Sequence, residues 1–294
     1  HRPGDELPKA HAVLDPKRSD CSYPFKELSG CGIGFKLVQA YANKNNIPIE
    51  NILPLLDLVA VSTAADIVPI VDENRVLMYF GLQQINKAPR QGLKAILDLA
   101  NAKRELTVSD LVFIIGPRIN AAGRVETGRK AVELLIADNT DAANEGAAGI
   151  NKTNLDRRVL DTDITQHALM MIEENTERHT KRTTVLFHRE WHKGVIGIVA
   201  SRLIDRYYKP TIILTESNGM ATGSARSVKD FDVYEAIEEC SHLLEQFGGH
   251  KYAAGLTMRL ENVNAFVQKF EEVVSSTIQE HMLVPEIELR SSLH

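Results

Sequence analysis

Hydrophobic positions along the chain alternate between short apolar runs and longer segments with helical spacing. The short runs are at residues 55–61, 183–187, 211–216 and 253–260, and apolar residues three or four positions apart occur at 34–45, 74–87, 195–208, 233–246 and 263–282. Short apolar runs predict buried strands, and the second spacing predicts amphipathic helices. This alternation predicts an α/β protein with largely parallel strand pairing.

Two further segments suggest how the chain is divided. Helical patterns dominate residues 91–138, interrupted by a predicted loop with the sequence GPRINAAGR at 116–124, and residues 140–175 read as one long polar helix with a narrow apolar stripe. A long polar helix of this kind often joins domains. We therefore expect a domain boundary near residue 175, followed by a second α/β unit in which FGGH at 247–250 forms a turn.

Length and composition fit two domains of ordinary globular protein, since 294 residues with 44% hydrophobic and 25% charged content can form two cores. No apolar run is long enough to span a bilayer and the N-terminal residues lack the features of a signal peptide, so a cytoplasmic location is expected, with no membrane partner. The three cysteines are widely spaced, which indicates free thiols.

The net charge of -5 argues against general coating of nucleic acid, but residues 181–210 contain seven lysines and arginines against two acidic residues. This cluster fits local binding of a polyanion or, equally, an ordinary solvated helix face.

Asp57 is the first candidate for chemistry, because it interrupts the apolar run at 55–61, where an ionised carboxylate is costly unless a cation or hydrogen-bond donors compensate it. A metal ion at the end of a parallel strand would compensate it, and a structural aspartate at a strand end is the alternative. Asp66, before Ile67 and Pro69, is expected to cap or shape a loop.

The segment GPRINAAGR combines glycines with Arg118, Asn120 and Arg124, so that backbone and guanidinium groups can both approach a ligand. That composition suits phosphate, although arginines near glycines also merely cap helices.

Three segments of the second unit point to the same chemistry. GSARS at 223–227 offers hydroxyls and a guanidinium suited to an oxyanion, and FGGH places a histidine after two glycines, where a simple turn residue is the alternative. In WHKGVIGIVASRL, Trp191 could stack on a base or close the core. The residues concerned are Ser224, Arg226, Ser227, Gly249, His250 and Trp191.

The chain has no GxxxxGK[ST], GxSxG, HExxH or GxGxxG sequence. This weighs against P-loop nucleotide hydrolysis, α/β-hydrolase chemistry, zincin chemistry and dinucleotide binding.

Taken in order, DLVAVSTAADIVP, ENR, GPRINAAGR, WHKGVIGIVASRL, GSARS and FGGHKYAAG resemble the RecJ family of the DHH phosphoesterase superfamily, from the opening HRPGDELPKAHAVLDPK to about residue 280. The resemblance implies the remainder of a DHH phosphoesterase domain (1–138, parallel sheet with helices), a connecting helix (139–175), a smaller α/β DHH-associated domain (176–283) and the start of a following domain (284–294). It places the active site in the cleft between the two domains.

The resemblance also implies site residues. His1 would be the second histidine of the DHH signature and, with Asp57, would lie at a catalytic Mn²⁺ or Mg²⁺ site, while Arg118, Arg124, Ser224, Arg226 and His250 would hold the DNA backbone and the terminal 5′ phosphate. The reaction implied is release of 5′ mononucleotides from single-stranded DNA with a 5′ end, by two-metal chemistry. Ser62 and Ala64 depart from the family pattern in ways that affect packing more than ligation.

Because the remaining metal ligands of the family would precede residue 1, this chain alone is expected to lack several of them and to be inactive. Two alternatives stay open: a DHH phosphodiesterase acting on oligonucleotides or cyclic dinucleotides, and a fragment that binds single-stranded DNA without cutting it. A monomer is expected, since no self-complementary apolar helix is evident.

Overall fold

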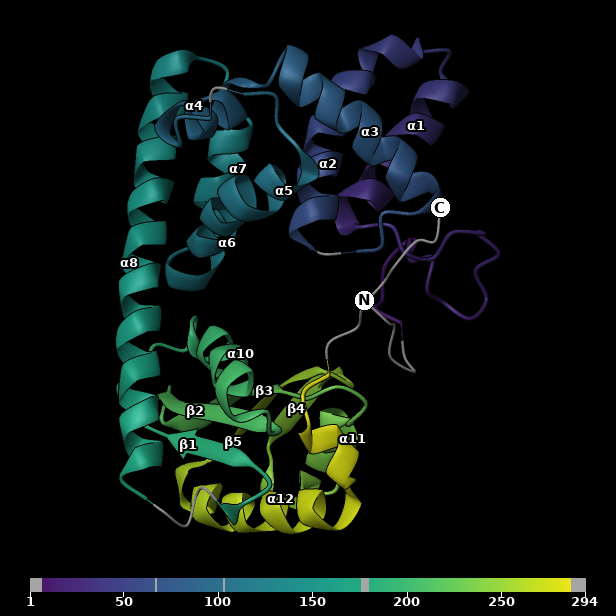
Figure 1. The fold of residues 1–294 in the computed structure, drawn as a ribbon. Coiled ribbons are helices and arrows are strands. Elements are labelled where there is room, and N and C mark those ends of the chain that lie inside the picture. The colour runs from purple at the N-terminus through teal and green to yellow at the C-terminus, as the bar shows by residue number, and fades with distance from the viewer. Residues whose placement is uncertain (1–6, 67, 103, 176–179, 287–294) are drawn as a thin grey trace, which may run out of the picture. The chain divides into compact units, whose positions relative to one another are not determined.

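The computed structural model describes residues 7–66, 68–102, 104–175 and 180–286 (Figure 1). The chain divides into two compact units, residues 1–155 and 156–294, and each is described by itself. The division falls within helix α8 (Thr140–Glu173), so that one continuous helix contributes to both units. This helix was predicted from its polar composition and narrow apolar stripe. The domain bounds taken from the resemblance stay predictions.

The described residues of the first unit form helices and contain no strand, so the parallel sheet predicted for this part is not found there. Helix formation was predicted correctly for residues 34–45 and 74–87 and for most of 91–138. The helices before α8 are α1 (Gly30–Lys44), α2 (Leu56–Ala65), α3 (Asp72–Lys87), α4 (Gln91–Leu99), α5 (Val108–Asp110), α6 (Gly116–Val125) and α7 (Arg129–Leu135).

The apolar run at 55–61, predicted as a strand, lies mostly in helix α2. Val59, Ala60 and Val61 are consecutive and all buried, so the helix is enclosed on every side rather than along one stripe. A short run of this kind cannot be told from a buried strand by periodicity. The neighbouring helix α3 approaches closely at Gly81, where an added Cβ would lie 2.2 Å from the Leu56 carbonyl oxygen.

The segment GPRINAAGR is helix α6 rather than the predicted loop. A π-helical turn over Leu111–Ile115 joins α5 to α6, and the Gly116 N–H donates to the Leu111 carbonyl. Pro117 then occupies the first turn of α6, where the N–H that it lacks is not needed. Glycine and proline, which usually end helices, here mark a change of helical register.

The second unit contains a five-stranded sheet in the order β1-β2-β3-β5-β4. Only β1 and β2 run parallel, and the other three pairings are antiparallel, so the prediction of largely parallel pairing is wrong. The strands are β1 (Thr184–Phe187), β2 (Thr211–Ser217), β3 (Met220–Arg226), β4 (Gln246–His250) and β5 (Ala253–Arg259).

Helices cover the two faces of this sheet differently. Helices α11 (Val233–Glu238) and α12 (Val263–Thr277) enclose the larger core with alternate side chains of the strands, and α10 (Ile196–Tyr207) lies over the opposite face (Figure 1). The strands at 183–187, 211–216 and 253–260 and the helices at 195–208 and 263–282 were predicted, the last ending earlier than expected. FGGH is strand β4 rather than a turn, and the helix predicted to reach residue 246 ends at Glu238.

Candidate functional site

The predicted site residues of the first unit do not gather into a metal centre within the described part of the chain. His1 lies outside the described residues. Among residues 7–286, leaving out the gaps given above, no group of three or more histidine, cysteine, aspartate or glutamate side chains is placed to hold a metal ion.

Asp57 is buried, with 1% of its surface exposed, and its charge is compensated by an arginine. The guanidinium of Arg90 donates twice to the carboxylate, from Nε to Oδ2 at 2.7 Å and from NH2 to Oδ1 at 2.6 Å. Arg90 also donates to the Leu135 carbonyl at 3.1 Å, which ties this pair to helix α7. Two parallel bonds of this kind satisfy a buried carboxylate without a metal. In this arrangement Asp57 does not offer a free metal ligand, and the metal-binding role stays a prediction.

Helix α6 displays the three polar residues of GPRINAAGR in different environments. Arg118 is half-buried and donates to the Asn151 side chain at 3.0 Å and to the Ile114 carbonyl at 2.7 Å. Asn120 and Arg124, about one turn apart, are both exposed. The structure thus exposes Asn120 and Arg124 to solvent, while contacts with the π-helical turn before α6 and with α8 hold Arg118 in place, and binding of phosphate by these residues stays a prediction.

In the second unit, strand β3 brings Ser224 and Arg226 together on the face that α10 partly covers. The Arg226 guanidinium donates from NH1 to the Ser224 hydroxyl at 3.0 Å and to the Ala225 carbonyl at 2.7 Å. A Cβ added at Gly197 of α10 would lie 2.8 Å from both the Ser224 hydroxyl and Arg226 NH2. Gly197 therefore leaves room for these two side chains, a role that the sequence analysis missed although the residue stands in WHKGVIGIVASRL.

His250 lies on the same face as Arg226, because both residues pair in register with Ala253. Two strand spacings separate their Cα atoms by about 10 Å. The exposed His250 imidazole accepts the Tyr252 N–H at Nδ1, over 3.3 Å, so in the neutral form its Nε2 carries the proton. A serine, an arginine and a histidine donor thus share one sheet face, which α10 partly covers, and this arrangement is suited to an oxyanion.

Gly249 shapes the backbone of strand β4, and its predicted role in binding phosphate stays a prediction. An added Cβ would lie 2.3 Å from the Ala253 carbonyl oxygen, and the residue has a φ of +156°. Only glycine allows β4 to pair so closely with β5 at this point.

Ser227 and Trp191 have structural contacts. The Ser227 hydroxyl donates to the Phe231 carbonyl at 2.8 Å and closes the loop after β3. The Trp191 side chain is 5% exposed, and its indole N–H donates to Nδ1 of His167 at 3.3 Å. Trp191 therefore packs in the core in this structure, and its stacking on a base stays a prediction.

Acidic residues outside residues 181–210 neutralise much of the basic cluster. Four of the cations make ion pairs: Arg182 with Glu280, Arg189 with Glu216, Arg202 with Asp161 and Arg206 with Glu173. Much of the local excess of positive charge is therefore neutralised by ion pairs, which weakens the case for a continuous polyanion-binding surface.

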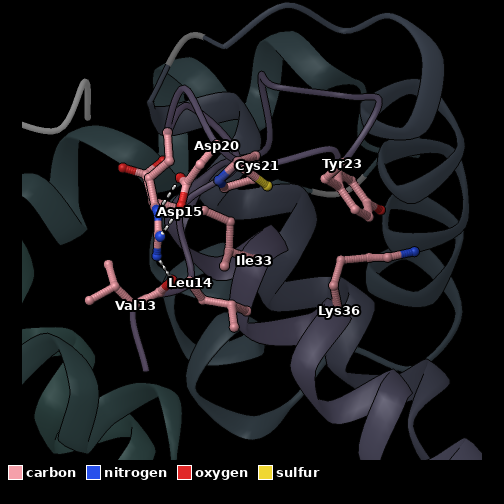
Figure 2. A pocket seen from close by; sticks show the side chains of 10 residues that line it. Val13, Leu14, Asp15, Asp20, Cys21, Tyr23, Ile33 and Lys36 are labelled. Carbon is pink, nitrogen blue, oxygen red and sulfur yellow. Dashed lines mark hydrogen bonds and ion pairs between the residues drawn. The ribbon is translucent and has the colours of Figure 1, made fainter. Parts of the chain in front are cut away.

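The first unit contains a separate hollow of about 270 Å³, which the sequence analysis did not anticipate (Figure 2). Apolar side chains of Val13, Leu14 and Ile33 line it, next to the ion pair of Arg18 with Asp20 at 2.6 Å. None of the predicted site residues lies among its lining residues. We assign it no part in the chemistry.

The sheet and helices of the second unit define a known class of domain, because residues 180–276 match the DHHA1 domain family. Sequence comparison extends the relationship along the whole chain. The chain is 40% identical over 288 residues to the single-stranded-DNA-specific exonuclease RecJ of Bacillus subtilis, a match that covers 97% of this chain and 36% of that protein. It is 36% identical over 305 residues to RecJ of Escherichia coli, covering 98% of this chain and 53% of that protein.

Along nearly its whole length, the chain is similar to RecJ proteins, which are named as single-stranded-DNA-specific exonucleases. The crystal structure of Thermus thermophilus RecJ in complex with Mn²⁺ superposes with a TM-score of 0.83 at 29% identity, covering 95% of this chain and 40% of that one. The structure of the same protein with Mg²⁺ gives a TM-score of 0.78 at 30% identity, covering 87% of this chain and 39% of that one. The chain thus spans about half or less of the length of these relatives.

Within the described residues, no helix has both the length and the apolar character needed to cross a membrane.

Proposed function

We propose that this protein acts on single-stranded DNA as part of a metal-dependent 5′ to 3′ exonuclease, and that its second unit holds the 5′-terminal phosphate. The observation that carries this proposal is the sheet face shared by Ser224, Arg226 and His250. The RecJ relatives, named as single-stranded-DNA-specific exonucleases, support the choice of substrate.

The chain's own residues would bind and orient the strand end. The guanidinium of Arg226, which the Ser224 hydroxyl and the Ala225 carbonyl orient, would bind phosphate oxygens by charge-assisted hydrogen bonds, and His250 would donate from Nε2 on the other side. In the first unit, Asn120 and Arg124 would bind the backbone of the strand. A divalent metal, when bound, supplies an activated water for attack on the phosphodiester. The described residues by themselves offer no complete ligand set for this metal.

The proposal is tested by binding of a fluorescent single-stranded oligonucleotide with either a 5′ phosphate or a 5′ hydroxyl. We expect the phosphorylated strand to bind about tenfold more tightly, and Arg226→Ala to abolish this preference, since charge-assisted bonds to phosphate are of that strength. Arg129→Ala serves as a control because Arg129 is 82% exposed on α7, outside the proposed site. Equal binding of both strands by the unaltered chain would reject the terminal-phosphate site.

Cleavage is measured separately, with Mn²⁺ and a 5′-phosphorylated strand, on this chain and on one extended upstream by the corresponding segment of a RecJ relative. Release of mononucleotides by the extended protein alone would support the exonuclease proposal. Phosphate-dependent binding without cleavage by either protein would favour a fragment that binds single-stranded DNA without cutting it.

A further inference from the structure

Strands β3, β5 and β4 enclose a second feature next to the proposed phosphate site, a hollow of about 360 Å³. Polar side chains of Thr222, Thr257 and Gln246 line it, together with the backbone at Gly248 and Gly255. Thr222 and Thr257 are half-buried, and Gln246 is exposed.

Strand register arranges this face in three parallel rows. Arg226, Ala253 and His250 form the first row, which is the proposed phosphate site. The middle row is Ser224, Gly255 and Gly248, and the third is Thr222, Thr257 and Gln246. The first and third rows are four residues apart along each strand, or about 13 Å. The hollow therefore exists because two of the three middle positions have no side chain.

The fold of the second unit does not require glycine at these two positions. An added Cβ at Gly248 would meet no atom within 4 Å, and one at Gly255 only the Gly223 carbonyl oxygen at 4.0 Å. Neither residue has a positive φ, in contrast to Gly249. Glycine inside a strand weakens the strand. Glycine at these two positions therefore lowers stability, and packing within the unit does not require it.

The third row supplies directional polar groups along the edge of the hollow. It continues into β2 at Thr215, whose hydroxyl donates to the Trp191 carbonyl at 2.6 Å and is thereby fixed. At the other end, the Gln246 amide offers both a donor and an acceptor at the exposed edge strand.

We propose that this hollow receives the base of the 5′-terminal nucleotide and that Gln246 reads the edge of that base. This inference rests on the proposed function, because it takes the terminal phosphate to lie at the first row. A flat, bare floor of peptide backbone fits a planar ring, and amide and hydroxyl groups at its rim match the donors and acceptors of a base edge. Gln246 is then a specificity-determining residue.

The test compares two 5′-phosphorylated strands that differ only in whether the first nucleotide carries a base. The unaltered chain is expected to bind the base-bearing strand about fivefold more tightly, a modest gain that fits burial of one ring on an open face. Gly255→Val fills the hollow from an interior strand that valine suits, and it should remove this preference without weakening binding of the abasic strand. Thermal unfolding shows whether the variant remains folded.

Gln246 is tested on strands that begin with each of the four bases. Gln246→Ala should narrow the differences in affinity among the four, while Gln268→Ala, an exposed glutamine on α12 of the opposite face, should leave them unchanged.

The outcomes separate this inference from the proposed function. If the chain prefers a 5′-phosphorylated strand but binds it equally with and without the first base, the inference is overturned and the phosphate site still stands. Loss of the phosphate preference itself rejects the proposed function. Retention of the base preference in a folded Gly255→Val variant also overturns the hollow as the base site.

Discussion

At the scale of single residues, Asp57 shows that a charge argument can predict the need for compensation without identifying the group that supplies it in the structure. A carboxylate inside an apolar run requires compensation, and the structure supplies it from Arg90, 33 residues further along the chain. Nothing in the local sequence pattern connects these two positions. The cost of burial was therefore predictable from sequence, while the identity of the compensating group was not.

Replacing Arg90 should strongly destabilise the first unit. Arg90→Met leaves the Asp57 carboxylate buried without its partner, and we expect the free energy of unfolding to fall by about 3 kcal/mol. Denaturant unfolding measures the change, and Arg129→Met, in an exposed ion pair, should change it by less than about 0.5 kcal/mol. An Arg90→Met variant with an unchanged free energy of unfolding would contradict this prediction. A variant that Mn²⁺ restores to the original stability would instead favour Asp57 as a metal ligand.

Cys240 should resist alkylation while the protein is folded. Burial raises the pKa of its thiol from 9.0 to about 11, and the thiol donates to the Ala236 carbonyl at 3.4 Å. Because the raised pKa favours the protonated form in the folded state, its contribution to stability is present below pH 9 and is lost as the pH rises towards 11. Mass spectrometry after iodoacetamide treatment at pH 8 should find Cys240 modified only in denaturant. Native labelling as fast as that of the half-buried Cys21 would contradict this.

At the scale of elements, the second unit was more predictable than the first. Strands β1, β2 and β5 were predicted from apolar runs, and helices α10 and α12 were predicted from the helical spacing of their apolar residues. Helix α2 was misassigned since it is buried on all sides, and α6 and β4 since their glycines were read as breaks. These three assignments depend on packing against residues that are distant in the sequence, which local sequence patterns do not show.

The same reasoning applies to the candidate site. Ser224, Arg226 and His250 were chosen as candidates from composition, because hydroxyls, a guanidinium and a histidine beside glycines suit phosphate, and their role stays a prediction. Gly197 and Gln246 were missed, since their relevance depends on the packing of α10 and on strand register.

Gly81 provides a prediction for the contact of α2 with α3. Alanine in place of glycine within a helix normally stabilises by about 1 kcal/mol. At Gly81 the added methyl would lie 2.2 Å from the Leu56 carbonyl oxygen and 2.7 Å from Ala60 Cβ, so we expect destabilisation by about 2 kcal/mol. Gly34→Ala in α1 is the matched control, because nothing lies within 4 Å there, and it should stabilise. Equal effects of the two substitutions on thermal unfolding would show that the helices can separate at little cost.

At the scale of the whole molecule, the distribution of charge does not favour a broad positive surface for nucleic acid. The net charge is -5, and much of the basic cluster at 181–210 is paired with acidic side chains. Binding of DNA should therefore depend on a small number of specific contacts rather than on a broad positive surface.

This leads to a weak dependence of binding on salt. For an oligonucleotide, the slope of log affinity against log salt should lie between about -1 and -3, as expected for two to four phosphate contacts at about 0.7 each. Arg226→Ala should reduce the slope by about 0.7, which titrations at several salt concentrations can resolve. A slope steeper than about -5 would point to a polyanion track instead.

The position of β4 at the end of the sheet has a consequence for solubility. An edge strand presents unpaired backbone groups that can recruit a strand from another molecule and begin aggregation. With two glycines among its five residues, β4 is a poor template for such growth. Substituting β-branched residues into β4 to strengthen the fold would therefore increase the tendency of this edge to pair with other molecules and aggregate. The low β propensity of β4 protects the exposed edge of the sheet against such pairing.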